Sequence, residues 1–233
     1  MIKQITKTPE KIVFTTDMET SLANTIRREI NEIQILAIDE VDIYKNDSAL
    51  YDQIIAHRLG LIPLKNQKLK KEDDFVEIRL KAMGTEVLSK ELGDYAVHEN
   101  IPIVLLEKDQ ELELVARAKL GMGKQHAKFI PGLTYYRILP KIDISKSGEK
   151  NHELSELYPQ IFEFKNNILK VKNDWQCDLD QEDIKEYEGI KITPTDELVF
   201  FIESWGQIEA KDIFLESLKA LRNNLSELKN SLK

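Results

Sequence analysis

The sequence predicts an α+β protein whose helices lie toward the two ends of the chain and whose middle is rich in strands. Three patterns carry this prediction. Apolar residues recur at helical spacing between residues 18 and 33, alternate with polar residues between 75 and 143, and recur as a heptad between 214 and 232. Alternation with period two is typical of half-buried strands, whereas spacings of three and four are typical of helices.

The N-terminal segment predicts a strand, a helix and a second strand. Residues 10–16 alternate, which indicates a half-buried strand. Thr16 and Glu19 match a capping box, in which a hydroxyl and a carboxylate bind exposed amides at a helix start. An apolar stripe then predicts a helix of about four turns. Its members are Met18, Leu22, Ile26, Ile30 and Ile33. Residues 33–44 are rich in Ile and Val, so a strand is expected next.

A second helix is expected over residues 49–59. Asp47 and Ser48 can cap its start, and Gly60 stands where a left-handed residue ends such a helix. The charged residues of 65–74 then predict a solvated loop.

The middle of the chain predicts a β-rich unit of its own. Four stretches alternate with period two and are separated by Gly and Pro. They are residues 75–80, 101–106, 111–119 and 135–143. Residues 145–152 predict a polar turn or linker. Residues 157–192 are acidic with weak periodicity, so no element is assigned there.

The C-terminal segment predicts a strand at 197–205 and a long helix from about 210 to 232. Six apolar residues recur on this helix at spacings of four and three, as on a helix packed along another helix. They are Phe214, Leu218, Leu221, Leu225, Leu228 and Leu232. Burying all six would contribute roughly 9–18 kcal/mol at about 1.5–3 kcal/mol each. Ordering some twenty residues costs about 1–2 kcal/mol per backbone position, so we expect the helix to need a mate.

Composition argues against several classes of function. The formal net charge is −8, and phosphate backbones are bound by clustered Lys and Arg, so a free-standing nucleic-acid binder is disfavoured. The single cysteine, Cys177, cannot form an internal disulfide or a four-cysteine metal site. The sequence contains neither a signal peptide nor the roughly 18 apolar residues of a membrane helix, and a cytoplasmic location fits.

Residues 121–128, GMGKQHAK, are the best candidate for a phosphate-binding loop. Glycines with nearby lysines can hold phosphate. The Walker spacing, however, places Ala118 where Gly belongs and Gln125 where Ser or Thr belongs. A glycine-hinged basic turn is the preferred interpretation, and a phosphate- or nucleic-acid-binding module is the alternative. Its lysines would be Lys119, Lys124 and Lys128.

Other candidates for chemistry are weaker. The four histidines lack metal-ligand spacing. The carboxylates of residues 178–183 could bind magnesium or calcium, but the EF-hand pattern is missing, so an acidic loop is preferred. No recognisable nucleophile motif occurs. We therefore predict no catalytic residue and no metal ligand. Arg27 and Arg28, opposite the first apolar stripe, form either a solvated face or a docking face, because Arg is favoured at interfaces.

Three segments in order resemble signatures of the RNA polymerase alpha-subunit family. SLANTIRREI at 21–30 resembles the first-helix signature, and IIAHRLGLIPL at 54–64 resembles the next. ARAKLGMGKQHAK at 116–128 resembles the segment typical of archaeal D subunits and of the eukaryotic third-largest subunit, where bacterial relatives diverge. The terminal strand, Gly206 and the heptad helix resemble the closing element, so the resemblance spans nearly the whole chain.

The resemblance implies a dimerisation domain built from both chain ends, residues 1–44 and 190–233, interrupted by an inserted β-rich domain, residues 45–189. The first and last helices would form the dimer contact. Its residues would be Leu22, Ile26, Ile30, Phe214, Leu218, Leu221, Leu225 and Leu228. The large subunits would dock elsewhere. Those residues would be Arg27, Arg28, His57, Arg58, Lys124, His126 and Lys128.

The function that the resemblance implies is a non-catalytic assembly scaffold of an archaeal-type DNA-dependent RNA polymerase, a nucleotidyltransferase complex. Such a chain pairs with the smaller homologous subunit L and recruits the second-largest subunit and the small subunits N and P. An alpha-like homodimeric scaffold is the alternative, because the same leucine seam permits self-pairing.

Some positions depart from the family pattern. Many archaeal D subunits carry a cysteine-rich insertion that holds iron–sulfur clusters. Here residues 145–189 are short and contain only Cys177, so no cofactor is expected. Gln125 replaces a commonly acidic residue, and Phe129 replaces an aromatic that is usually Trp. Bacterial members continue from the last helix into a DNA-binding domain, and direct DNA binding is not expected here.

Overall fold

The structure, a computed structural model, describes residues 2–67 and 74–232. The chain forms two compact units, each assembled from segments that are distant in sequence. Unit 1 contains Met1–Thr6, Val13–Ala23 and Tyr135–Phe201, and unit 2 contains Lys7–Ile12, Asn24–Thr134 and Ile202–Lys233. None of the helices in the described ranges is long and apolar enough to cross a membrane.

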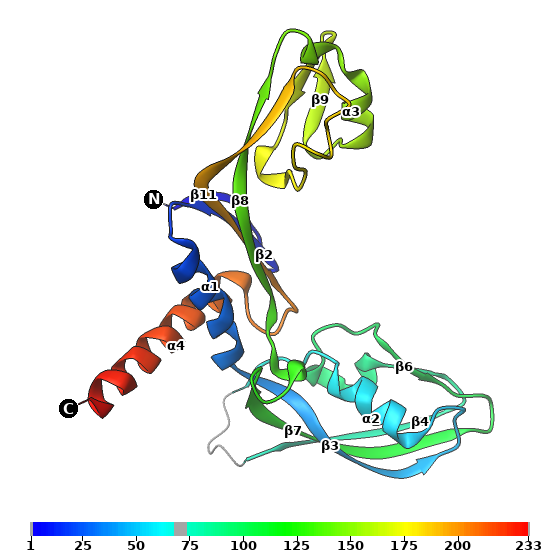
Figure 1. The fold of residues 1–233 in the computed structure, drawn as a ribbon. Coiled ribbons are helices and arrows are strands. Elements are labelled where there is room, and N and C mark those ends of the chain that lie inside the picture. The colour runs from blue at the N-terminus through cyan, green and yellow to red at the C-terminus, as the bar shows by residue number, and fades with distance from the viewer. Residues whose placement is uncertain (1, 68–73, 233) are drawn as a thin grey trace. The chain divides into compact units, whose positions relative to one another are not determined.

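Unit 1 holds most of a four-stranded sheet with the order β1-β2-β11-β8 (Figure 1). The strands are β1 (Lys3–Lys7), β2 (Lys11–Thr16), β11 (Ile190–Ser204) and β8 (Gly132–Ile144). Aromatic rings on neighbouring strands stack on one another. The ring of Phe14 stacks on that of Phe200 at 5.4 Å, and the ring of Tyr135 stacks on that of Phe201 at 4.5 Å. Such pairs stabilise a sheet beyond the apolar area they bury.

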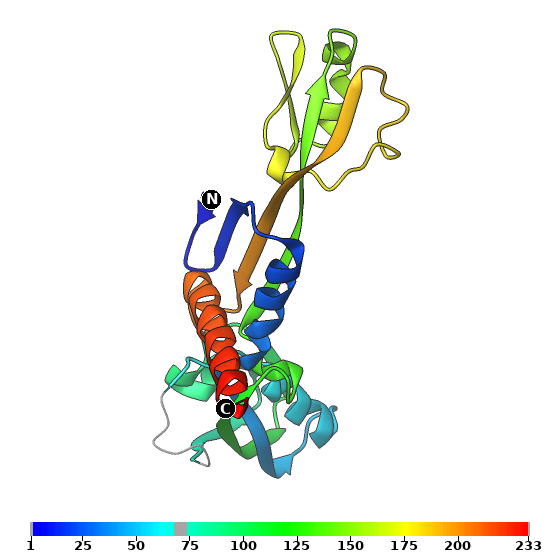
Figure 2. The same ribbon diagram turned by 60° about the vertical axis from the view of Figure 1, so that its left-hand side comes forward.

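Residues 145–189 form a small lobe of unit 1 with an apolar cluster of its own (Figure 2). Its elements are η4 (Gly148–Lys150), α3 (His152–Leu157), β9 (Phe162–Lys165), β10 (Ile168–Val171) and η5 (Asp174–Gln176). Asn166 and Asn167 join the hairpin β9–β10 with φ of 55° and 62°. Asparagine favours such a left-handed pair. Buried Leu154, Phe162 and Cys177 belong to the cluster.

Unit 2 is built on a three-stranded antiparallel sheet with the order β3-β7-β4. The strands are β3 (Gln34–Asn46), β7 (Glu111–Met122) and β4 (Val76–Met83). Side chains on β7 alternate as the period-two pattern requires. Leu114 and Ala116 are buried, whereas Arg117 is ion-paired with Asp42 at 2.8 Å. One face of the sheet is therefore apolar and the other charged.

The apolar face of this sheet shares its core with α2 (Asp52–Gly60) and with the strand pair β5 (Glu86–Leu88) and β6 (Pro102–Leu105), which flank η2 (Ser89–Tyr95). Ile55 and Leu59 on α2 are fully buried in that core. A further short helix, η3 (Ala127–Phe129), follows β7 and buries Phe129.

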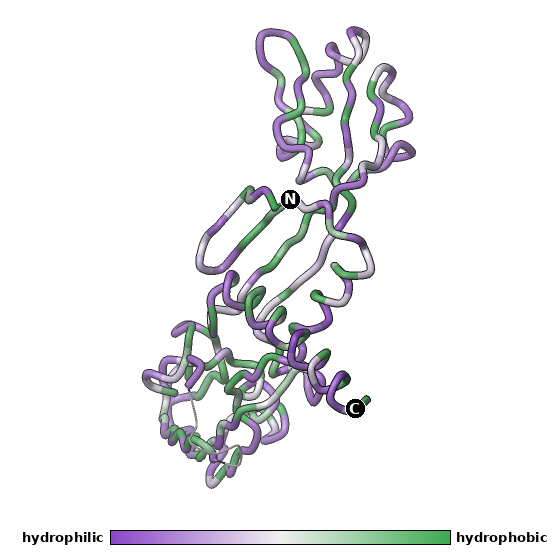
Figure 3. The backbone as a smooth tube through the Cα atoms, turned by 90° about the vertical axis from the view of Figure 1, so that its left-hand side faces the viewer, coloured by the Kyte–Doolittle hydropathy of each residue, from purple (hydrophilic) through white to green (hydrophobic). Residues whose placement is uncertain are grey.

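Two further helices complete the fold. They are α1 (Thr20–Glu29), which continues into η1 (Ile30–Glu32), and α4 (Ala210–Ser231). Helix α4 contacts η1, and buries Ala210, Ile213 and Ser217. Along α4 hydrophobic positions recur between stretches of hydrophilic ones (Figure 3).

The predicted α+β class is confirmed, and so are most of the predicted strands and the long C-terminal helix. Strand β8 was predicted to belong to the β-rich middle of the chain. It pairs instead with β11, in the sheet that lies mostly in unit 1. The compact units also cross the predicted division into residues 1–44 plus 190–233 and residues 45–189. Compactness alone does not test that division, which stays a prediction.

Three local predictions were wrong or fall partly outside the described residues. Thr16 accepts a hydrogen bond from the Met18 amide in a turn, and α1 begins only at Thr20. Helix α2 begins at Asp52 without a side-chain cap, and Gly60 lies inside it. Residues 68–73 of the predicted charged loop lie outside the described residues.

Candidate protein interface

Helix α4 has two halves with different surroundings. In its first half Ala210, Ile213 and Ser217 are buried by the chain itself. In its second half Leu225 and Leu228 are each 58% exposed and Leu232 is 80% exposed. A polar contact marks the change, because Asn224 Nδ2 lies 3.0 Å from Glu29 Oε2. The heptad seam is therefore partly buried by the chain in the first half of α4 and exposed to solvent in the second half.

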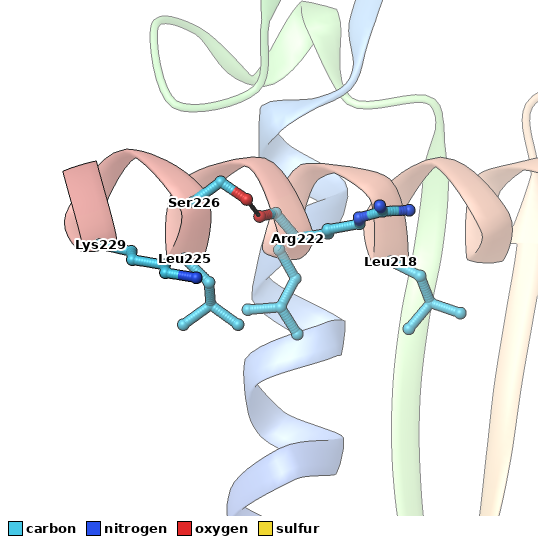
Figure 4. Close-up of a pocket in the computed structure, with 6 residues that line it drawn as sticks. Leu218, Arg222, Leu225, Ser226 and Lys229 are labelled. Atoms are coloured by element: carbon cyan, nitrogen blue, oxygen red, sulfur yellow. Dashed lines mark hydrogen bonds between the residues drawn. The ribbon is translucent and has the colours of Figure 1, made fainter.

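A shallow groove with a volume of about 350 Å³ lies along this seam (Figure 4). Its lining residues are Leu218, Leu221, Arg222, Leu225, Ser226 and Lys229. Leu218 and Leu225 point to the same side of the helix, with Arg222 and Lys229 beside them. Leaving a leucine exposed forgoes about 1.5–3 kcal/mol of burial. A contiguous apolar row of this kind indicates a site that another protein surface covers.

The first apolar stripe is divided between the surface and the interior. Leu22 is 45% exposed, whereas Ile26 and Ile30 are 3% and 5% exposed. Ile26 and Ile30 are therefore packed inside the chain, and of these three residues Leu22 is the one exposed to solvent. The reason is geometric. Residues four apart on a helix are offset by about 40°, so a stripe at that spacing turns gradually around the helix.

Of the two arginines on α1, Arg27 is held by its own helix. Its Nε and Nη2 atoms donate to Asn24 Oδ1 at 3.2 and 3.0 Å. Arg28 is exposed and lines a polar pocket of about 400 Å³ with Lys124. Lys124 is already ion-paired there, since its Nζ atom lies 2.6 Å from Glu32 Oε2. Arg28 is therefore the more available of these cations.

Asp39 pairs with two of the three lysines of the phosphate-binding alternative, Lys119 and Lys128. Its carboxylate lies 2.6 Å from Lys119 Nζ and 2.5 Å from Lys128 Nζ. Burial raises the pKa of Asp39, but hydrogen bonds from Lys119 and Lys128 outweigh this effect and lower the pKa below its usual value. His126 accepts a hydrogen bond from the Lys128 amide at 3.1 Å and so shapes the turn. These pairings weaken the phosphate-binding alternative, because Lys119 and Lys128 are already held by the Asp39 carboxylate.

The α2 candidates are partly drawn into the fold. Arg58 Nη1 donates to the Ile103 carbonyl at 2.7 Å, and His57 is exposed. The C-terminal end of α2 approaches the basic turn, because a Cβ at Gly60 would lie 3.9 Å from Lys128 Cδ. The structure thus brings the α2 end and Lys128 together.

A neighbouring pocket was not predicted from the sequence. It has a volume of about 350 Å³, and Leu61, His98, Lys128 and Trp205 are among its lining residues. Trp205 and Leu61 are 44% and 53% exposed, and His98 Nε2 lies 3.0 Å from the Trp205 carbonyl oxygen. An exposed Trp before Gly206 is the signal that could have identified it, because Trp is enriched at interfaces.

Two carboxylates of the acidic segment at residues 178–183 accept hydrogen bonds within the segment. Asp180 Oδ1 accepts from the amides of Glu182 and Asp183 at 2.7 and 3.1 Å, and Asp183 Oδ2 accepts from the Asp180 amide at 2.8 Å. This arrangement favours a structural turn. Cys177 is buried in the lobe, and burial raises the pKa of its thiol above the ordinary value, which keeps it protonated.

These features define an α+β interaction chain whose last helix presents an uncovered leucine seam. Residues 13–225 match the family described as the RNA polymerase Rpb3/Rpb11 dimerisation domain. The chain belongs to this family.

Several relatives support the same placement over most of the chain. The chain is 34% identical to DNA-directed RNA polymerase subunit Rpo3 of Pyrococcus horikoshii, with 99% of this chain and 97% of the relative covered. It is 36% identical to Rpo3 of Pyrococcus furiosus over 86% of this chain and 84% of the relative. It is 31% identical to Rpo3 of Methanocaldococcus jannaschii over 95% and 90%.

Proposed function

We propose that this chain is a non-catalytic assembly subunit of a DNA-directed RNA polymerase and that it pairs with a second, smaller subunit through α4. One observation carries the proposal. Leu225, Leu228 and Leu232 are the most exposed members of a heptad seam in a family whose shared domain is a dimerisation domain. Covering the seam removes apolar surface from water, which is the main favourable contribution to association.

The chain then acts as a platform for larger subunits. Arg28 is the best-supported docking residue, because it is exposed beside the Lys124–Glu32 pair. Trp205 and Leu61 add a second candidate surface. The partners in this scheme are the small subunit L, the second-largest subunit, and the small subunits N and P. The complex works in the cytoplasm.

The chain needs no cofactor in this function. Its single cysteine, Cys177, is buried among the apolar residues of the 145–189 lobe. An apolar cluster supplies the packing of that lobe, so the lobe has a means of folding that does not depend on a metal cluster.

Substitution of the seam tests pairing directly. Leu221→Glu places a charge in the groove, and we expect it to abolish co-purification of the chain with its co-expressed small subunit. Asn223→Glu is the matched control, because Asn223 is exposed and lies on the side of α4 opposite the leucines. Recovery of the Leu221→Glu complex at wild-type yield would contradict the proposal.

Folding of the variant must be checked separately, because Leu221 is half-buried. Leu228→Glu serves this purpose, since Leu228 is largely exposed and its replacement leaves the interior unchanged. An unchanged thermal unfolding temperature together with lost pairing places the defect in the interface.

A homodimeric scaffold is the second candidate, since the same uncovered leucines could pack against a second copy. Sedimentation equilibrium of the chain alone separates the two. A monodisperse, stable homodimer favours the homodimer, whereas a monomer that becomes a 1:1 complex when the small subunit is added favours the heterodimer.

A further inference from the structure

The charges beside the leucine groove have one sign. Arg222 and Lys229 both line the groove. They are seven residues apart, so on a helix with 3.6 residues per turn they differ by only about 20° around the axis. Ser226 lies between them and donates its hydroxyl hydrogen bond to the Arg222 carbonyl at 2.8 Å. The rim of the groove is therefore two cations separated by a neutral residue (Figure 4).

The acidic residues of the same helix point elsewhere. Asp212, Glu216 and Glu227 lie about 80°, 120° and 140° around the axis from Arg222. Glu216 is ion-paired with Lys219 at 2.5 Å. None of the three carboxylates lines the groove, so none of them neutralises the rim.

The opposite edge of the leucine seam, away from Arg222 and Lys229, is not open to a partner. Ile213, Ser217 and Asn224 lie on that side, where the first two are buried by the chain and Asn224 bonds Glu29. An incoming helix that covers the leucines must therefore lie against the side that carries Arg222 and Lys229. Its residues will meet these two cations whatever direction it runs.

From this arrangement, and resting on the proposed pairing function, we infer that the occupant of the groove is a helix of a different polypeptide that carries Asp or Glu opposite Arg222 and Lys229. A second copy of this chain does not fit this description. In a two-fold pair the same surface meets itself. The described rim offers cations alone, so self-pairing brings like charges together across the seam, whereas an acidic partner is attracted. The rim thus selects a heterodimer over a homodimer.

The test uses the full-length chain and the small subunit co-expressed with it. Affinity is measured at low and high salt for wild type, Arg222→Glu/Lys229→Glu and Asn223→Glu/Asn230→Glu. The last variant is the control. It adds two carboxylates with the same spacing to exposed positions on the side of α4 opposite the leucines. Leu225→Glu, in the groove itself, completes the set.

We expect Arg222→Glu/Lys229→Glu to weaken pairing about tenfold at low salt, because two attractions become repulsions. The loss should shrink at high salt, which screens charges near the surface. The control should bind like wild type at both salt concentrations. Unchanged or tighter binding of Arg222→Glu/Lys229→Glu would overturn the inference of an acidic partner.

The outcomes separate this inference from the proposed function. If Leu225→Glu loses the small subunit while Arg222→Glu/Lys229→Glu keeps it, pairing through α4 stands and the acidic partner is rejected. If Leu225→Glu also keeps the small subunit, the proposed pairing itself is rejected. Sedimentation of wild type alone adds a further check, since a tight homodimer at low salt would contradict the selection against self-pairing.

Discussion

Asn224 on α4 donates a hydrogen bond from Nδ2 to Glu29 Oε2 at the end of α1, at 3.0 Å. On the N-terminal side of this bond α4 is partly covered by its own chain. On the C-terminal side Leu225 and Leu228 are mostly exposed. The bond marks the point where packing within the chain gives way to the candidate interface.

Truncation after Asn224 should therefore separate folding from pairing. The side chains of residues 225–232 are exposed. We therefore expect deletion of residues 225–233 to lower the thermal unfolding temperature by no more than a few degrees, where 1 kcal/mol corresponds to roughly 2–4 °C for a chain of this size. Pairing with the small subunit should be lost. Thermal unfolding followed by circular dichroism, together with co-purification, measures both. A large drop in unfolding temperature would mean that the deleted segment stabilises the free chain.

Gly121→Ala should destabilise unit 2. A Cβ atom at Gly121 would lie 2.6 Å from the ring of buried Phe129, so the ring must move. Overpacking of this kind costs about 1–3 kcal/mol, which chemical denaturation can measure.

Gly60→Ala is the matched control for that change. The nearest heavy atom to a Cβ there is the Ile38 carbonyl oxygen at 3.6 Å, an ordinary contact, and Gly60 lies in helix α2. Alanine is preferred to glycine in a helix, so stability should stay equal or rise by up to about 1 kcal/mol. Equal losses in the two variants would refute the steric explanation.

Asp39→Asn should cost about 1 kcal/mol at neutral pH, because two partly exposed lysine pairs are lost. The cost should depend on pH in one direction. The pKa of Asp39 is lowered in the folded chain, so its contribution is present above the ordinary value of 3.8 and disappears as pH falls through the lowered value.

Denaturant unfolding between pH 7 and pH 2 tests this dependence. The wild-type and Asp39→Asn curves should converge toward the acid end of the range. Glu40→Gln is the control, since Glu40 is exposed and lies 3.5 Å from Arg117, and its effect should be small throughout. A constant difference at every pH would show that the effect of the substitution does not come from the ionisation of Asp39.

Cys177 should resist thiol reagents in the folded chain. Its side chain is buried, burial raises its pKa, and the thiolate is the reactive form. At pH 8 we expect modification to be slow until guanidinium unfolds the chain, when one thiol should react at once. Rapid stoichiometric labelling of the native chain would show that the lobe opens readily.

The strands and α4 could be predicted because their patterns are local. Alternation along β7 and the heptad along α4 are properties of neighbouring residues. Pairing is not local. The segment 135–143 alternates like the strands before it, yet β8 pairs with β11, because alternation defines a strand's faces and leaves its neighbour open. The lobe at 145–189 escaped prediction because its short elements pack around apolar residues scattered in sequence.

The candidate site shows the same division. The heptad predicted an apolar seam, but it did not predict which end of the seam is buried by the chain itself. The buried residues Ile213 and Ser217 mark that end, and neither belongs to the heptad. The basic residues were predicted as docking candidates. Their partners, Asp39 for Lys128 and Glu32 for Lys124, come from distant segments that only the fold brings near.

The exposed leucines at the end of α4 also have a consequence for the amount of this chain that a cell makes relative to its partner. A copy made in excess of its companion keeps Leu225, Leu228 and Leu232 in water, and such patches adhere to other apolar surfaces. We expect unpaired copies to aggregate more readily than paired ones, because pairing removes these leucines from water. Under the proposed pairing, production of the two polypeptides in equal amounts leaves no such surplus.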